Sequence, residues 1–318
     1  MIRPLCPKTR LFGPVALLVL AALLLGGCGM TTKVVEYWEG QDSSLRKRVS
    51  VAPFSANLEV LKPQAQAMQK IIAKGLEQQG GLVLLDFASL DQEMAQLPQK
   101  SGSAEDLAYE AGRRMGLNTV LAGNLTDLAV VRQMKGIYGF RDNAPFLTLE
   151  GEFRLLDMTT STILAQTSFR QQEVISDVDA EGITMNNATP DPKVVAKLVA
   201  EMTKEVQAWV QGKINAQPWG GTVLEVQGDK VLITVGRDTG LPTGTNLVVY
   251  ALGDRIKCGT GQEICLTGPP VAKVRLLELG ARSSWAEVAQ RVQPPAPDKN
   301  TPAPPPAPIL PGQIVRTR

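Results

Sequence analysis

One short stretch decides the fold of this chain: the apolar run LVLLDF at residues 82–87, preceded by the pair Gly80-Gly81. An apolar run of this length, bounded by glycine, is typical of a strand buried on both faces. Such a strand needs covering helices, because an apolar sheet face must be packed against another element. The run therefore predicts a sheet with helices over it.

The neighbouring segments alternate between strand and helix. Residues 48–54 predict an opening strand, and residues 63–79 predict a helix that ends at the glycine pair. A short helix with Ser89 as its N-cap and a helix over residues 104–115, ending at Gly116, follow the apolar run. Strand, helix, strand and helix in this order indicate an α/β arrangement.

Three strands and a long helix complete this first domain, which we expect to span residues 48–215. The strands are predicted to begin at residue 118 and to cover 146–156 and 162–173, as a meander. Residues 192–214 have apolar side chains at helical spacing and predict an amphipathic helix that closes the domain. The first domain is therefore expected to be α+β or α/β, a mixed sheet with covering helices.

Between Val131 and Pro145 we expect a loop that binds a partner protein. Its candidate binding residues are Arg132, Lys135, Tyr138, Phe140 and Arg141. Exposed aromatic side chains beside arginine are typical of protein interfaces. An ordinary hairpin loop with solvated charges is the alternative interpretation.

Residues 216–318 have a different pattern, with short β runs separated by glycine-containing turns at 221–226, 230–235, 246–250 and 271–276. This pattern predicts a small all-β, barrel-like domain. Nine of the 22 prolines lie within residues 294–311 and predict an extended loop. Residues 312–318 regain strand character, so they are either a closing strand of the barrel or a frayed tail.

The first 27 residues have the order of an export signal, with Arg3, Lys8 and Arg10 before an apolar run over residues 11–25. The run is too short for a spanning helix. It ends in LGGC at 25–28, which resembles the lipobox of bacterial lipoproteins and implies that Cys28 is lipidated; a plain secretory signal is the alternative. Gly29 stands where an aspartate would retain a lipoprotein at the inner membrane, so the resemblance implies the periplasmic face of the outer membrane. Residues 28–47 then form a tether.

The cysteines are consistent with export. Cys6 leaves with the signal and Cys28 is acylated, so Cys258 and Cys265 remain in an oxidising compartment and are expected to form a disulfide. A redox or metal pair is the alternative, although six intervening residues match neither the redox spacing nor a zinc knuckle.

Composition argues against catalysis. The chain has 318 residues and no histidine, which removes the imidazole base and histidine-ligated metals. Its formal charge of +2 indicates no nucleic-acid partner, and it has no glycine-rich phosphate-binding motif. We therefore expect no enzyme activity, no cofactor and no metal. A peptidoglycan hydrolase that uses two carboxylates is the alternative, with Asp86, Glu150, Glu152 and Asp157 as its candidate groups.

Three stretches resemble a family of bacterial envelope proteins: VSVAPF at 49–54, GLNTVLAG at 116–123, and residues 154–164. The pattern is similar to the domain shared by the curli-secretion lipoprotein, the lipoprotein activators of penicillin-binding proteins, the amino-terminal domain of TolB and the middle domain of flagellar assembly protein T. Residues 221–250 and 311–315 resemble the carboxy-terminal domain of flagellar assembly protein T. Thr160-Ser161 departs from the Gly-Glu turn that is common in the third motif.

The resemblance implies a non-enzymatic lipoprotein that assembles, scaffolds or activates an envelope machine, with a flagellar-ring-like assembly factor favoured. Activation of penicillin-binding proteins and a curli-type secretion role are the alternatives. The expected partners are the membrane, through the lipid, and a flagellar basal body, a penicillin-binding protein or a secretion apparatus; a homo-oligomeric ring is a further expectation. The chain lacks the amino-terminal domain of flagellar assembly protein T, and that protein is not usually lipidated.

Overall fold

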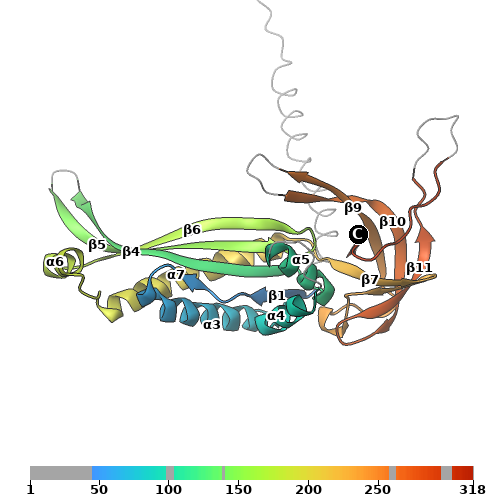
Figure 1. The fold of residues 1–318 in the computed structure, drawn as a ribbon, viewed down its shortest axis with the longest axis horizontal. Coiled ribbons are helices and arrows are strands. Elements are labelled where there is room, and N and C mark those ends of the chain that lie inside the picture. The colour runs from blue at the N-terminus through green and yellow to red at the C-terminus, as the bar shows by residue number, and fades with distance from the viewer. Residues whose placement is uncertain (1–44, 98–103, 138–139, 258–262, 295–302, 318) are drawn as a thin grey trace, which may run out of the picture. The chain divides into compact units, whose positions relative to one another are not determined.

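The computed structural model describes residues 45–97, 104–137, 140–257, 263–294 and 303–317. The expected signal peptide and most of the tether, including Cys28, lie outside these ranges. Residues from Leu45 onward form one unit, in which a mixed sheet with covering helices is followed by a closed six-stranded barrel (Figure 1). The predicted fold class is therefore confirmed.

The mixed sheet has the strand order β3-β1-β4-β5-β6. Its strands are β1 (Lys47–Val51), β3 (Leu82–Leu85), β4 (Thr119–Ile137), β5 (Phe140–Asp157) and β6 (Thr162–Val174), and the short β2 (Ser55–Ala56) pairs with β4. Strand β1 runs parallel to both β3 and β4, whereas β4, β5 and β6 form the predicted antiparallel meander.

The apolar run that predicted the sheet becomes β3, a short edge strand, and it ends earlier than expected. Asp86 leaves the strand to cap the next helix, accepting a hydrogen bond from the Ala88 N–H at 3.2 Å. That helix, α4 (Phe87–Gln96), therefore begins two residues before Ser89, and the expectation that Ser89 is its N-cap was wrong. A carboxylate caps a helix start as well as a hydroxyl does, so the helix begins at the earlier residue, Asp86.

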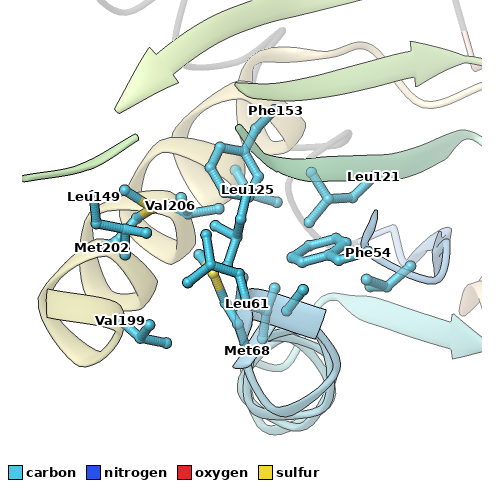
Figure 2. Packing of buried hydrophobic residues seen from close by; sticks show 14 of the residues in the cluster. Phe54, Leu61, Met68, Leu121, Leu125, Leu149, Phe153, Val199, Met202 and Val206 are labelled. Carbon is cyan, nitrogen blue, oxygen red and sulfur yellow. The ribbon is translucent and has the colours of Figure 1, made fainter. Parts of the chain in front are cut away.

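Helices cover both faces of the sheet. The 3-10 turn η1 (Glu59–Leu61), α3 (Lys62–Gln78) and α7 (Pro192–Ala216) belong to one face, while α4 and α5 (Ala104–Met115) pack with the other around Tyr109 and Leu117. Figure 2 shows residues of the first interface: Met68 of α3, Met202 of α7 and the strand residue Phe153 belong to the same buried cluster. The run at 82–87 was expected to be buried on both faces, but Leu82, Val83 and Leu84 are only half-buried because β3 lies at the edge of the sheet. Strand β1, which lies between β3 and β4, is buried along its whole length.

Phe153 is accommodated by two glycines. A Cβ atom on Gly123, its cross-strand neighbour, would lie 2.8 Å from the Phe153 ring, and one on Gly151 would lie 3.0 Å from it. The freed space lets Phe153 meet Phe54 and Phe169 edge to face, at centroid distances of 5.6 and 5.9 Å. Gly123 and Gly151 are therefore packing residues of the core.

The barrel closes through the end of the chain. Its strands are β7 (Gly221–Gln227), β8 (Lys230–Ile233), β9 (Asn246–Lys257), β10 (Glu263–Leu279), β11 (Ser284–Arg291) and β12 (Ile314–Arg316), in the order β10-β11-β8-β7-β12-β9. Strand β12 pairs with both β7 and β9, so the residues after the proline-rich segment form a closing strand rather than a frayed tail. Trp219 and Ile309 are buried in the core of the barrel.

A buried arginine joins the sheet to the barrel. Arg48 of β1 is 1% exposed, and its Nε and Nη2 atoms donate to the two carboxylate oxygens of Asp238 at 2.7 Å each. Its remaining donors reach the carbonyl oxygens of Thr234 at 2.8 Å, Arg282 at 2.7 Å and Met115 at 3.3 Å. All five N–H donors of the guanidinium are thus satisfied.

The backbone around Arg48 is built to fit it. Gly116 has φ +69°, and a Cβ atom there would lie 2.5 Å from the Arg48 Nη1 atom. The Asn118 side chain accepts from the Arg48 N–H at 2.9 Å and donates to the Gly220 carbonyl at 2.6 Å. Lys47 donates to the Ile214 carbonyl at the end of α7, where a cation is favourable. We call this cluster around Arg48 and Asp238 the junction.

Replacing Arg48 tests the junction. Arg48→Met leaves the Asp238 carboxylate and three carbonyls without their donors, and breaking a buried pair typically costs about 3–5 kcal/mol. We expect a loss of that size in the free energy of unfolding, measured by urea denaturation. The matched control is Arg275→Met, which removes an exposed pair with Glu287 within the barrel and should cost less than about 1 kcal/mol. Equal losses in the two variants would contradict the role of the junction.

Candidate protein-docking site

The expected partner-binding loop is a pair of strands. Strands β4 and β5 remain paired as far as Ile137 opposite Phe140, so the expectation of a loop between Val131 and Pro145 was wrong. Strand periodicity was hidden there because β4 and β5 continue past the main core, where pairing between strands does not require alternating apolar residues. We call residues 132–137 and 140–145 the arm.

The structure places most of the predicted binding residues on the arm. Arg132 lies opposite Pro145, Lys135 opposite Asp142, and Arg141 opposite Gly136. Phe140 pairs with Ile137 where the strands end, and Tyr138 lies outside the described residues. The four described residues therefore belong to one pair of strands rather than to one continuous loop.

A helix that the sequence reading missed, α6 (Asp177–Asn186), lies beside the arm (Figure 1). Ser176 is its N-cap: the hydroxyl accepts from the Asp179 N–H at 3.1 Å and donates to the Asp179 carboxylate at 2.6 Å. Asn187 ends the helix with φ 51°. The helix lacks an apolar stripe, so periodicity did not reveal it, but serine followed three residues later by a carboxylate is a capping pattern that could have done so.

Few contacts hold α6 in place. Arg132 donates to the Asp177 carboxylate at 2.7 Å, which ties the start of the helix to β4. Ala180 is buried and Ile183 packs against the main core. The rest of the helix faces outward, so the arm and α6 form one surface that stands beyond the core.

Large apolar side chains are exposed on this surface. Val178 is 80% exposed and Met185 is 79% exposed, and their spacing of seven residues puts them on the same side of α6. On β4, Met134 is 69% exposed. Leaving such side chains in water forgoes about 1.5–3 kcal/mol each relative to full burial, so their grouping marks an interaction surface. We call Val178 and Met185 the α6 face.

The surroundings of the α6 face are acidic. Residues 171–192 contain five carboxylates and no lysine or arginine. Glu173 is paired with Lys197 at 2.7 Å, Asp177 is paired with Arg132, and Asp191 caps α7, which leaves Asp179 and Glu181 beside the apolar residues. An apolar surface with an acidic border is repelled by anionic lipid and suits a protein surface with a basic border.

The candidate carboxylates of the hydrolase alternative have structural roles. Asp86 caps α4, and Glu150 forms an ion pair with Arg170. Asp157, which is buried, accepts from the Thr159 N–H at 2.8 Å and the Thr159 hydroxyl at 2.6 Å. Glu152 is an exposed strand residue. Within the described ranges, no three cysteine, aspartate or glutamate side chains are grouped so that they could hold a metal ion.

The predicted cysteine chemistry falls mostly outside the described residues. Cys28 and Cys258 both lie there, and Cys265 occupies a position on β10 opposite Arg255. The lipid at Cys28 and the disulfide between Cys258 and Cys265 therefore stay predictions. In the stretches that the structure describes, no helix is both long and apolar enough to cross a membrane.

No family model and no curated protein matches the chain. Part of it is similar to solved bacterial structures. Hypothetical protein CT253 from Chlamydia trachomatis is 15% identical, with a TM-score of 0.33 over 52% of this chain and 99% of that one. Lipoprotein GNA1162 from Neisseria meningitidis is 17% identical, with a TM-score of 0.28 over 52% of this chain and 99% of that one. The LpoB C-terminal domain from Salmonella enterica is 16% identical, with a TM-score of 0.27 over 41% of this chain and 85% of that one. At these values the similarity is a distant resemblance, from which no function follows.

The cap of α6 gives a local test of this surface. Ser176→Ala removes the N-cap bonds, which are worth about 1 kcal/mol, so amide hydrogens of α6 should exchange about fivefold faster. Hydrogen exchange with mass spectrometry measures this rate. The matched control is Asp191→Ala at the N-cap of α7, which has eight buried residues and should keep its slow exchange beyond the first turn. Unchanged exchange in α6 after Ser176→Ala would contradict the idea that few contacts hold it.

Proposed function

We propose that the protein is a non-catalytic lipoprotein of the outer membrane that assembles, scaffolds or activates a complex of the cell envelope. It is held at the periplasmic face through Cys28 and docks onto its partners through the arm and α6. The observation that carries this proposal is the exposed α6 face, together with Met134, on a surface that stands beyond the core.

Two features of the sequence support the anchoring and the absence of catalysis. The run from Arg3 to Cys28 has the charge, apolar stretch and small residues of a lipoprotein signal. Several acyl chains on one cysteine would hold the protein on a membrane, because each buried CH₂ is worth about 0.8 kcal/mol. The chain has no histidine, and three of the four candidate carboxylates already serve caps, turns or ion pairs.

Among envelope machines, we favour a flagellar-ring-like assembly. The support is the order of the two parts, a mixed sheet followed by a small barrel, together with the resemblance of residues 221–250 and 311–315 to flagellar assembly protein T. Activation of a penicillin-binding protein and a curli-type secretion role are the alternatives, because the first part resembles those proteins as well. A homo-oligomeric ring is compatible with each of them.

Anchoring is tested by metabolic labelling with a palmitate analogue followed by separation of inner and outer membranes. We expect the native chain to carry label in the outer membrane and Cys28→Ala to lose it. Cys265→Ala keeps Cys28 and should label like the native chain. If Cys28→Ala is labelled as strongly as the native chain, Cys28 is not the lipidated residue and this part of the proposal is wrong.

The role of the arm is tested in cells. A strain that produces the double variant Val178→Asp/Met185→Asp should lose motility as fully as a deletion strain, because two carboxylates on an apolar docking face prevent its burial. Immunoblots must show equal protein levels. The matched control is Ile71→Asp on α3, where the native side chain is 53% exposed but outside the arm. A deletion strain with normal motility, wall synthesis and secretion would refute the proposed function.

A further inference from the structure

A run of exposed apolar residues, APPPAPILP at 303–311, lies on the barrel just before β12 (Figure 1). Every side chain in this run is apolar, and all of them except Ala303 and Ile309 are exposed. Leu310, for example, is 53% exposed. A contiguous exposed apolar surface marks a site of interaction, and this one belongs to neither the arm nor α6. We call residues 303–311 the proline run.

The sequence fixes the conformation of the proline run. A proline ring holds φ at about −65°, and a residue that precedes proline is restricted to extended backbone. Each residue from Ala303 to Pro308 is a proline or precedes one, so this part of the run forms a polyproline II helix. In agreement, residues 303–310 belong to neither an α-helix nor a paired strand.

Buried contacts at the end of the proline run hold it against the barrel. The Ile309 side chain is 5% exposed and belongs to the barrel core. The Gln313 side chain, which is also buried, accepts from the Leu310 N–H at 3.1 Å and donates to the Pro308 carbonyl at 3.4 Å. The run is therefore presented in one position, which lowers the entropy that a partner must remove when it binds.

The prolines are spaced for recognition. Pro305, Pro308 and Pro311 follow one another at intervals of three residues, and all three are exposed. Polyproline II has three residues per turn, so Pro305 and Pro308 lie on the same side of the helix. Ile309 takes the side that faces the barrel core, which leaves the side with Pro305 and Pro308 for a partner. A pair of prolines at this spacing is the pattern that aromatic-lined grooves bind.

The backbone of the proline run selects the kind of partner. Pro304, Pro305 and Pro306 offer carbonyl acceptors but no N–H donors, so the run lacks the donors that pairing with a sheet edge requires. In the hydrocarbon of a membrane these carbonyls would lack donors as well. A protein groove lined by tryptophan and tyrosine supplies flat rings for the prolines and N–H or O–H donors for the carbonyls.

We propose that the proline run is a docking ligand that binds in an aromatic-lined groove of a partner protein. Pro305 and Pro308 enter the groove, while Ile309 stays in the barrel and fixes the run from below. This contact goes beyond the proposed function, because it uses a part of the chain that is separate from the arm and α6. The protein then has two docking elements, and either can be lost without the other.

Photo-crosslinking in cells tests this contact with the full chain. A benzophenone amino acid replaces Ala307, which is exposed between Pro305 and Pro308. We expect a protein product in which mass spectrometry locates the crosslink within a few residues of a tryptophan or tyrosine of the partner. The matched control carries the same amino acid in place of Lys230 on β8, which is also exposed, and should give at most a tenth of that product.

Two double variants show whether the prolines themselves are recognised. Pro305→Ala/Pro308→Ala should lower the yield of the product at least fivefold, because it removes both rings and frees the extended conformation. Pro269→Ala/Pro270→Ala removes two exposed prolines of β10 and should leave the yield unchanged. Immunoblots must show equal protein levels in all strains.

Three outcomes would overturn the proposal. They are a product with lipid alone or no product, a crosslink far from any aromatic side chain of the partner, and a yield that Pro305→Ala/Pro308→Ala leaves undiminished. None of them bears on the α6 face, because the variants at Val178 and Met185 are tested separately by motility.

Discussion

The rest of the structure depends on the burial of one charged side chain. A guanidinium without water must find a partner for each of its five donors, and Arg48 finds them on Asp238 and on three carbonyl oxygens from α5 and the barrel. Because these partners come from segments far apart in sequence, the network forms only when the sheet and the barrel are both folded and in register. Hydrogen bonds at the junction thus fix the position of the barrel against the sheet, whereas apolar packing alone would allow several positions.

The second constraint is the length of β4 and β5. Apolar packing with α3 and α7 requires only the part of these strands that carries Leu121, Leu149 and Phe153, yet their pairing continues to Ile137 and Phe140. Beyond the core, pairing between the two strands holds the arm together. Among the described residues, Arg132, Ala180 and Ile183 hold α6 beside the arm.

Sequence reasoning succeeded where side chains are buried. The periodicity of residues 192–214 located α7, and the alternation within 146–173 located the meander, because burial imposes a pattern on each of them. It failed where the backbone is ordered without burial: the arm was taken for a loop, and α6 was missed because its apolar residues, Val178 and Met185, point to solvent. Arg48 was counted only as a strand residue, since its partner Asp238 is 190 positions away and no local pattern indicates the pair.

The exposure of Val178 and Met185, which hid α6 from the periodicity of the sequence, is also the reason for proposing a docking site there. A helix whose apolar residues face outward is less stable alone than one with a buried apolar stripe. Binding of a partner to these residues would therefore stabilise α6. The arm extends from the same sheet that Arg48 of β1 joins to the barrel. The network around Arg48 and Asp238 therefore sets how α6 is held relative to the barrel, although neither residue lies on the surface that α6 presents.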